Sequence, residues 1–153
     1  MDGSRADILR VMIAINRVTS IYGTAAKADG INGSTLELLY ALDDGLPHTQ
    51  KQICEEWFIP RTTLNTAVKE CVERGYVSLS GVEHSKEKII VVTGSGKEYA
   101  RRMLGDFYAA EQRAIERTRA EFTGSFVAGL ERFADCLQSE FETGIFRVSP
   151  AKK

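Results

Sequence analysis

The chain has 153 residues, of which 43% are hydrophobic and 27% charged, and its formal net charge is −1. These values are typical of one globular domain with its own core rather than of a disordered chain. The sequence has no run of about 18 apolar residues, so we expect no membrane-spanning segment. The net charge neither supports nor excludes a nucleic-acid partner, because a local basic face can bind phosphates while acidic residues lie elsewhere.

The first predicted helix covers residues 5–28. Ile8, Met12 and Ile15 recur at steps of three or four residues and define an apolar face. Further apolar residues make this face so broad that we expect the helix to be buried on more than one side. The N-terminus leads into this amphipathic pattern rather than into a signal peptide, so we expect a cytoplasmic protein. Two Asx-Gly pairs in residues 29–33 end the helix.

Two capping boxes predict the next two helices. Residues 34–37 (Ser-Thr-Leu-Glu) begin a short helix, and residues 46–48 then form an extended link. Residues 49–52 (Thr-Gln-Lys-Gln) begin a second helix, with Ile53 and Trp57 one turn apart on its inner side.

The helix that follows has one face suited to DNA. Pro60 marks its entrance, it covers roughly residues 61–74, and Gly75 ends it in a left-handed conformation. Its expected buried stripe consists of Leu64, Ala67, Val68, Cys71 and Val72. The opposite face carries Arg61, Thr62, Asn65, Thr66 and Lys69. These polar side chains suit DNA better than a protein core.

A charged hairpin comes next. Residues 76–79 and 89–92 have the pattern of two strands, and the polar segment 80–88 forms the tip between them. The predicted fold class is therefore mainly α with a small β-hairpin wing, that is, a winged helix-turn-helix flanked by long helices.

The C-terminal part is predicted to form two helices. Thr93 can cap a helix that runs from residue 95 to about residue 120, where Thr123-Gly124 interrupts the pattern. A last helix places large apolar side chains on one face, namely Phe126, Leu130, Phe133, Leu137 and Phe141. Residues 150–153 are expected to form a frayed tail.

We expect a single domain over residues 1–153, with a DNA-binding lobe at 31–94 and a helical dimerisation region at 5–28 and 95–143. The three long helices carry more apolar surface than so small a winged unit can cover. Either they fold back on their own domain, or they form a shared dimer core. Two-fold DNA sites favour dimers whose recognition helices lie about 34 Å apart.

Four consecutive motifs resemble the MarR family of transcriptional regulators: residues 50–56 (QKQICEE), 59–63 (IPRTT), 73–77 (ERGYV) and 92–97 (VTGSGK). The resemblance covers the central winged helix closely and the flanking parts by helix layout. It implies a homodimeric winged helix-turn-helix protein that binds double-stranded DNA, usually represses genes and often answers to a small-molecule effector or an oxidant.

By position, the resemblance assigns two groups of DNA-binding residues. The recognition-helix residues are Arg61, Thr62, Thr63, Asn65, Thr66 and Lys69, and the wing residues are Lys86 and Lys88. Near the wing base, many family members carry an Asp-x-Arg pair where this chain has His84 and Lys86. A lysine keeps the charge but loses the planar fork of arginine, so we expect weaker insertion into the minor groove. Phe58 replaces a small turn residue and is expected to pack under the turn with Trp57.

Each candidate residue has an ordinary alternative. Arg61 can reach a guanine or a phosphate, or be a solvated arginine, and Asn65 can pair with adenine or simply be exposed. The threonines suit phosphate contacts. Lys69, Lys86 and Lys88 are either phosphate contacts or plain surface lysines. All of these alternatives stay open from the sequence.

Cysteines and histidines give no metal or cofactor site. Cys54, Cys71 and Cys136 are widely spaced without a CxxC pair, and only His48 and His84 accompany them. We expect all three cysteines to be small buried hydrophobes. Oxidant-sensing relatives carry a reactive cysteine in the first helix, and residues 5–28 contain none, which argues against redox sensing.

No catalytic pattern emerges, so we do not expect an enzyme. Residues 94–97 (GSGK) superficially resemble a phosphate-binding loop, but Val91 and Glu98 occupy positions where that motif needs Gly and Ser or Thr. The leading hypothesis is a DNA-binding regulator. The second is a winged-helix protein-interaction module that does not bind DNA.

Overall fold

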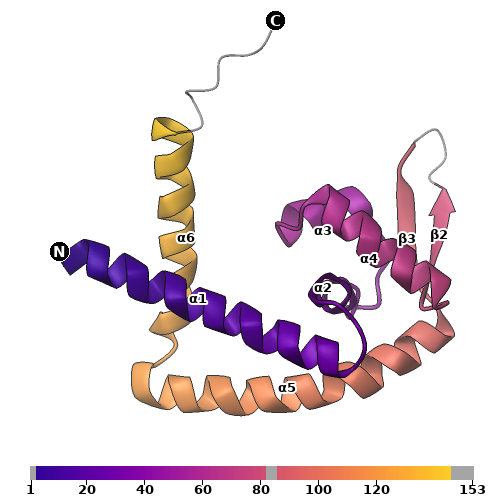
Figure 1. Cartoon of the computed structure of the whole chain (residues 1–153), viewed down its shortest axis with the longest axis horizontal. Helices are drawn as coiled ribbons and strands as arrows, with labels where there is room; N and C mark the ends of the chain where they lie inside the picture. The colour runs from indigo at the N-terminus through magenta and orange to yellow at the C-terminus, as the bar shows by residue number, and fades with distance from the viewer. Residues whose placement is uncertain (1–2, 82–85, 146–153) are drawn as a thin grey trace, which may run out of the picture. The chain divides into compact units, whose positions relative to one another are not determined.

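The computed structural model describes residues 3–81 and 86–145 (Figure 1). In chain order its elements are α1 (Gly3–Ala28), α2 (Gly33–Ala41), β1 (His48–Thr49), α3 (Gln50–Glu56), α4 (Arg61–Glu73), β2 (Val77–Gly81), β3 (Lys88–Val92), α5 (Gly94–Phe122) and α6 (Ser125–Gly144). The predicted fold class, mainly α with a small β wing, is confirmed. The chain divides into two compact units, Met1–Asp106 and Phe107–Lys153, and the expectation of a single domain stays a prediction.

Helix α1 exists as predicted, but its broad apolar face remains exposed within this chain. Ala26, near its C-terminal end, is buried. The large apolar side chains Ile8, Leu9, Met12, Ile13, Ile15, Val18 and Ile21 are each at least 40% exposed. Gly30 then adopts a φ of 75°, which ends the helix.

Helix α2 begins earlier than the predicted capping box. Asn32 is its N-cap, and the Asn32 side-chain oxygen accepts a hydrogen bond from the Thr35 backbone N–H at 2.8 Å. The Ser34 hydroxyl donates to that same oxygen at 2.6 Å, so it supports the cap without being the cap. The capping box expected at residues 34–37 is therefore wrong, because Asn caps as well as Ser and stands first.

The second capping box is confirmed at the start of α3. The Thr49 hydroxyl accepts from the Gln52 N–H at 3.1 Å, and the Gln52 side chain accepts from the Thr49 N–H at 2.8 Å. The turn after α3 differs from expectation. Phe58 is 82% exposed with a φ of 52°, and Trp57 is 43% exposed, so neither is buried under the turn. Ile59 fills that place and is buried.

Helix α4 packs its predicted stripe into the core of the winged unit. Leu64, Ala67, Val68 and Cys71 are all almost completely buried. Val72 was expected to join them and instead is 41% exposed. The core that this stripe enters also contains Leu38, Leu42, Ile53, Ile59, Val77 and Ile90.

The wing is an antiparallel hairpin with a third strand beside it. Strands β2 and β3 pair from Val77 with Val92 to Gly81 with Lys88. The expected extended link contains part of β1, in which His48 and Thr49 pair with Ile90 and Ile89, giving the order β1-β3-β2. His84 lies outside the described residues.

The junction from the wing to α5 is closely packed. The Thr93 hydroxyl donates to the Gly75 carbonyl at 2.6 Å and accepts from the Gly96 N–H at 3.0 Å, which confirms Thr93 as a cap. Gly75 has a φ of 73°, as predicted. A Cβ on Gly96 would lie 1.9 Å from the Tyr76 carbonyl oxygen, so only glycine fits there.

The second unit contains the end of α5 and all of α6. Thr123, with a φ of 59°, interrupts the helical pattern at the predicted place. No residue of α6, within the described chain, is buried. Phe126, Leu130, Leu137 and Phe141 are between 39% and 46% exposed, and Phe133 is half-buried. Cys136 is exposed too, so the expected burial of this cysteine is wrong for the single chain. The tail at 150–153 lies outside the described residues.

None of the helices in residues 3–81 and 86–145 combines the length and hydropathy that a bilayer crossing requires.

Candidate nucleic-acid interface

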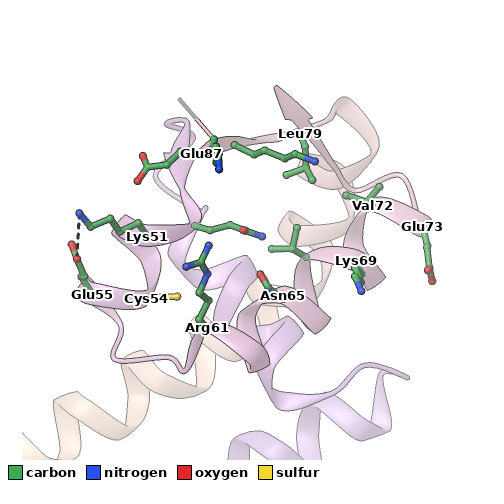
Figure 2. A pocket seen from close by; sticks show the side chains of 14 residues that line it. Lys51, Cys54, Glu55, Arg61, Asn65, Lys69, Val72, Glu73, Leu79 and Glu87 are labelled. Atoms are coloured by element: carbon green, nitrogen blue, oxygen red, sulfur yellow. Dashed lines mark ion pairs between the residues drawn. The ribbon is translucent and has the colours of Figure 1, made fainter. Parts of the chain in front are cut away.

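An open groove of about 690 Å³ lies between α3, α4 and the β2–β3 wing (Figure 2). Helix α4 contributes Arg61, Asn65 and Lys69, which follow one another at four-residue steps and so share one flank of the helix. The wing contributes Lys86 and Lys88 from the opposite side. Residues from two elements that are distant in sequence therefore line the same groove.

Five of the eight predicted site residues line this groove, and three do not. Thr62, Thr63 and Thr66 are exposed on α4 but lie outside the groove lining. The Thr66 hydroxyl donates to the Thr62 carbonyl of its own helix at 3.2 Å. A phosphate contact by the Thr66 hydroxyl as donor thus requires that this bond be given up.

The N-terminus of α4 opens beside the groove. Pro60 occupies the N-cap position and has no side-chain group that could accept from the first N–H groups of the helix. Those N–H groups and the positive end of the helix dipole make such a terminus receptive to an anion. Arg61, the first helical residue, adds a guanidinium that points into the groove in Figure 2.

Several groove residues were not predicted from the sequence. Helix α3 contributes Gln50, Lys51, Cys54 and Glu55, while Val72, Glu73, Leu79 and Glu87 come from α4 and the wing. Lys51 and Glu55 form an exposed ion pair at 3.9 Å. The four-residue spacing of Lys51 and Glu55 was a visible signal for that pair, but not for its proximity to α4 and the wing.

The charge of the groove differs from the charge of the chain. Five cationic side chains line it, namely Lys51, Arg61, Lys69, Lys86 and Lys88, against the three carboxylates of Glu55, Glu73 and Glu87. The chain as a whole carries a formal charge of −1. The groove is therefore locally basic, as a phosphate-binding surface needs to be.

Known proteins share this fold. Residues 29–86 match the family model described as MarR family. A MarR family regulator from Neisseria meningitidis superposes with a TM-score of 0.71 at 19% identity, over 94% of this chain and 99% of the other. AbsC, a MarR family transcriptional regulator from Streptomyces coelicolor, gives 0.73 at 16% identity, over 91% and 97%.

Reduced AbfR bound to DNA gives a TM-score of 0.69 at 20% identity, over 90% of this chain and 99% of that one. No curated protein matches the sequence. The predicted resemblance to the MarR family and the predicted winged-helix fold are confirmed.

Proposed function

We propose that this chain, whose residues 29–86 match the family model described as MarR family, is a sequence-specific DNA-binding transcriptional regulator. The observation that supports it most is the basic groove, where Arg61, Asn65 and Lys69 of α4 meet Lys86 and Lys88 of the wing. A helix of this kind enters the major groove of DNA, and a wing beside it reaches the neighbouring backbone.

The residues divide by the part of DNA that they suit. Arg61 and Asn65 have the planar donor and acceptor groups that recognise guanine and adenine in the major groove. Lys69, Lys86 and Lys88 carry compact charges that suit phosphates. Thr62, Thr63 and Thr66 lie on the outer face of α4, and there they are proposed to contact the backbone once α4 enters the groove.

We further propose a homodimeric repressor that a small-molecule effector releases from DNA. The exposed apolar faces of α1 and α6 support self-association, because a monomer rarely leaves so many large apolar side chains in water. Two copies would present two copies of α4 to a two-fold site. The similar protein AbfR is seen bound to DNA, which supports the DNA-binding part of this proposal.

A gel-shift assay on the promoter beside the protein's own gene tests the proposal. Replacing Arg61 or Asn65 by alanine should weaken binding to that promoter by roughly 1–3 kcal/mol if each residue recognises a base. Binding to random duplex should change much less. Arg101→Ala, which removes an exposed charge from α5 outside the groove, is the matched control. Equal losses on both duplexes would make Arg61 and Asn65 backbone contacts.

The second candidate function is a winged-helix module that binds another protein instead of DNA. The three carboxylates in the groove favour it, since Glu55, Glu73 and Glu87 would lie near phosphates in a DNA complex. The same gel shift separates the two functions. If neither the promoter nor random duplex shifts at low salt, the DNA-binding proposal is wrong and the protein-interaction module stands.

A further inference from the structure

The carboxylate of Glu70 joins α4 to the beginning of α2. Its Oε2 accepts a hydrogen bond from the Thr35 hydroxyl at 2.6 Å and another from the Asn32 side-chain amide at 2.8 Å. Its Oε1 pairs with Arg74 at 3.0 Å. Because Asn32 is the N-cap of α2, this carboxylate also lies at the positive end of that helix.

Arg74 extends the connection to the end of α1. Besides pairing with Glu70, its guanidinium donates to the carbonyl oxygen of Gly30 at 3.1 Å. Gly30 belongs to the turn that ends α1, where its φ is 75°. Asn32, Thr35, Glu70 and Arg74 therefore form one hydrogen-bonded group, the Glu70 cluster, which links α4 with the α1–α2 turn.

The burial of Thr35 makes this geometry specific. Thr35 is completely buried, and its hydroxyl would lose considerable free energy without an acceptor. Its acceptor is the Glu70 carboxylate, whose side chain is only 22% exposed. A charged acceptor with two donors and an arginine tolerates little displacement, so the cluster fixes where this side of α4 lies.

A second attachment lies at the C-terminal end of α4. The hydroxyls of Thr93 and Ser95 both donate to the Gly75 carbonyl, at 2.6 and 2.9 Å. The rings of Tyr76 and Tyr99 stack with centroids 4.1 Å apart. The C-terminal half of α4 is thus held by polar bonds from the α1–α2 turn and from the start of α5.

The N-terminal half of α4 carries Arg61 and Asn65, the two groove residues that are proposed to recognise bases. Arg61 precedes Glu70 by nine residues, which is about 13 Å along a helix at 1.5 Å per residue. A rotation of about 5° at Glu70 would then move Arg61 by roughly 1 Å, enough to spoil a bidentate contact with a base. Small changes at the cluster are therefore amplified at the groove.

We propose that Glu70 is a positioning residue, which sets the angle at which α4 presents Arg61 and Asn65 to DNA. This inference rests on the DNA-binding function proposed above. It assigns the effect to the bonds from Thr35 and Arg74, not to any contact of Glu70 with DNA.

Two variants remove one bond each and keep the shape of the site. Thr35→Val deletes the hydroxyl but preserves side-chain volume, and Glu70→Gln keeps an oxygen for Thr35 while losing the charge opposite Arg74. Thr35→Ser retains the hydroxyl and is the conservative rescue. Glu37→Gln removes the same charge from an exposed position of α2 and is the matched control.

The ratio of promoter affinity to random-duplex affinity is the decisive measurement. We expect Thr35→Val and Glu70→Gln to lower that ratio roughly tenfold, because a rotated α4 misplaces its base-recognising side chains while phosphate contacts tolerate a small rotation. Thr35→Ser and Glu37→Gln should keep the wild-type ratio. If Thr35→Val lowers only the melting temperature and leaves the ratio unchanged, Glu70 is merely structural and the inference is wrong.

Hydrogen exchange on the DNA-free proteins separates this inference from the proposed function. Loss of the cluster should speed exchange together in residues 29–36 and 61–74 in Thr35→Val, and not in Thr35→Ser. If the wild-type protein has no promoter preference, the proposed function fails, and coupled exchange would still support the cluster as the device that holds α4. Unchanged exchange in both segments would overturn the inference regardless of DNA binding.

Discussion

Phe58 is held in a backbone conformation that suits glycine. Its φ is 52°, in the left-handed region, where a Cβ costs roughly 1–2 kcal/mol. Its ring is 82% exposed and so gains little from packing. The turn between α3 and α4 therefore carries strain that local packing does not offset, which leaves room for a stabilising substitution.

Phe58→Gly should raise the free energy of unfolding by about 0.5–1 kcal/mol. This is the net gain after the relief of backbone strain is reduced by the larger conformational entropy that glycine has in the unfolded chain. Urea denaturation measures it. Phe58→Ala removes the same ring but keeps the Cβ, so it should give no such gain. Equal effects of the two substitutions would show that the backbone is not strained.

The thiol of Cys71 should be the least reactive of the three cysteines. Burial raises its pKa from 9.0 to about 11, with the nearby Glu70 carboxylate adding to the effect. At pH 8 it is therefore protonated, and thiols react as thiolates. A thiol-reactive dye should label Cys71 slowly in the native protein. Once urea unfolds the chain, the dye should label all three cysteines, and peptide mapping would identify the labelled positions.

The same shift sets the sign of a pH effect on stability. The folded state holds the Cys71 proton more tightly than the unfolded state. The stability that this protonated thiol contributes is therefore complete below pH 9.0 and is lost as the pH rises toward 11. Cys71→Ala should show a shallower loss of stability over that interval. Fast labelling of Cys71 in the native protein would contradict its burial.

At the scale of elements, the wing should act through charge. Lys86 is exposed beside β3, and Lys88 is the exposed first residue of that strand. Removing one lysine–phosphate interaction should flatten the slope of log affinity against log salt by about 0.9. Changing both lysines to alanine should therefore weaken all duplexes alike and leave sequence preference nearly intact.

Lys27→Ala with Lys97→Ala removes the same charge from exposed positions outside the groove, and should leave the slope unchanged. If the wing variant also keeps the wild-type slope, the wing is a structural hairpin. A loss of sequence preference would instead mean that Lys86 or Lys88 recognises bases.

The elements most accurately predicted from the sequence are those with local causes. The capping box at Thr49, the left-handed Gly75 and the cap at Thr93 depend on residues a few positions apart. Strand β1 was missed because a two-residue strand is defined by its pairing with Ile89 and Ile90, forty residues away. Asn32 was missed because Asn32 and Ser34, two positions apart, are both good N-cap residues and compete for one cap.

The groove was predictable on its α4 and wing sides, but not on its α3 side. Helical spacing alone places Arg61, Asn65 and Lys69 together, and hairpin length places the wing lysines near one another. That α3 would add Lys51 and Glu55 depends on how α3 packs against α4 across the core. The Glu70 cluster depends on packing too, since Thr35 and Glu70 are 35 residues apart and neither is unusual alone.

At the scale of the whole molecule, the exposed apolar surface predicts a homodimer. Ile13 of α1 is 66% exposed, and Leu130 of α6 is 46% exposed, although both belong to apolar faces of long helices. Burying such faces in a second copy would remove several large side chains from water, each worth about 1.5–3 kcal/mol when fully buried. Light scattering should therefore report a mass near twice 17.0 kDa.

Ile13→Asp and Leu130→Asp should shift that mass toward 17.0 kDa without unfolding the chain, because neither side chain is buried in the single copy. Circular dichroism should show the helices retained. Glu131→Gln, an exposed change on α6 beside the apolar face, should leave the dimer intact. The monomeric variants should keep weak binding to random duplex and lose tight promoter binding, since two linked copies of α4 raise affinity through effective concentration. If the wild-type protein is a monomer at micromolar concentration, the proposed homodimer that binds a two-fold DNA site is wrong.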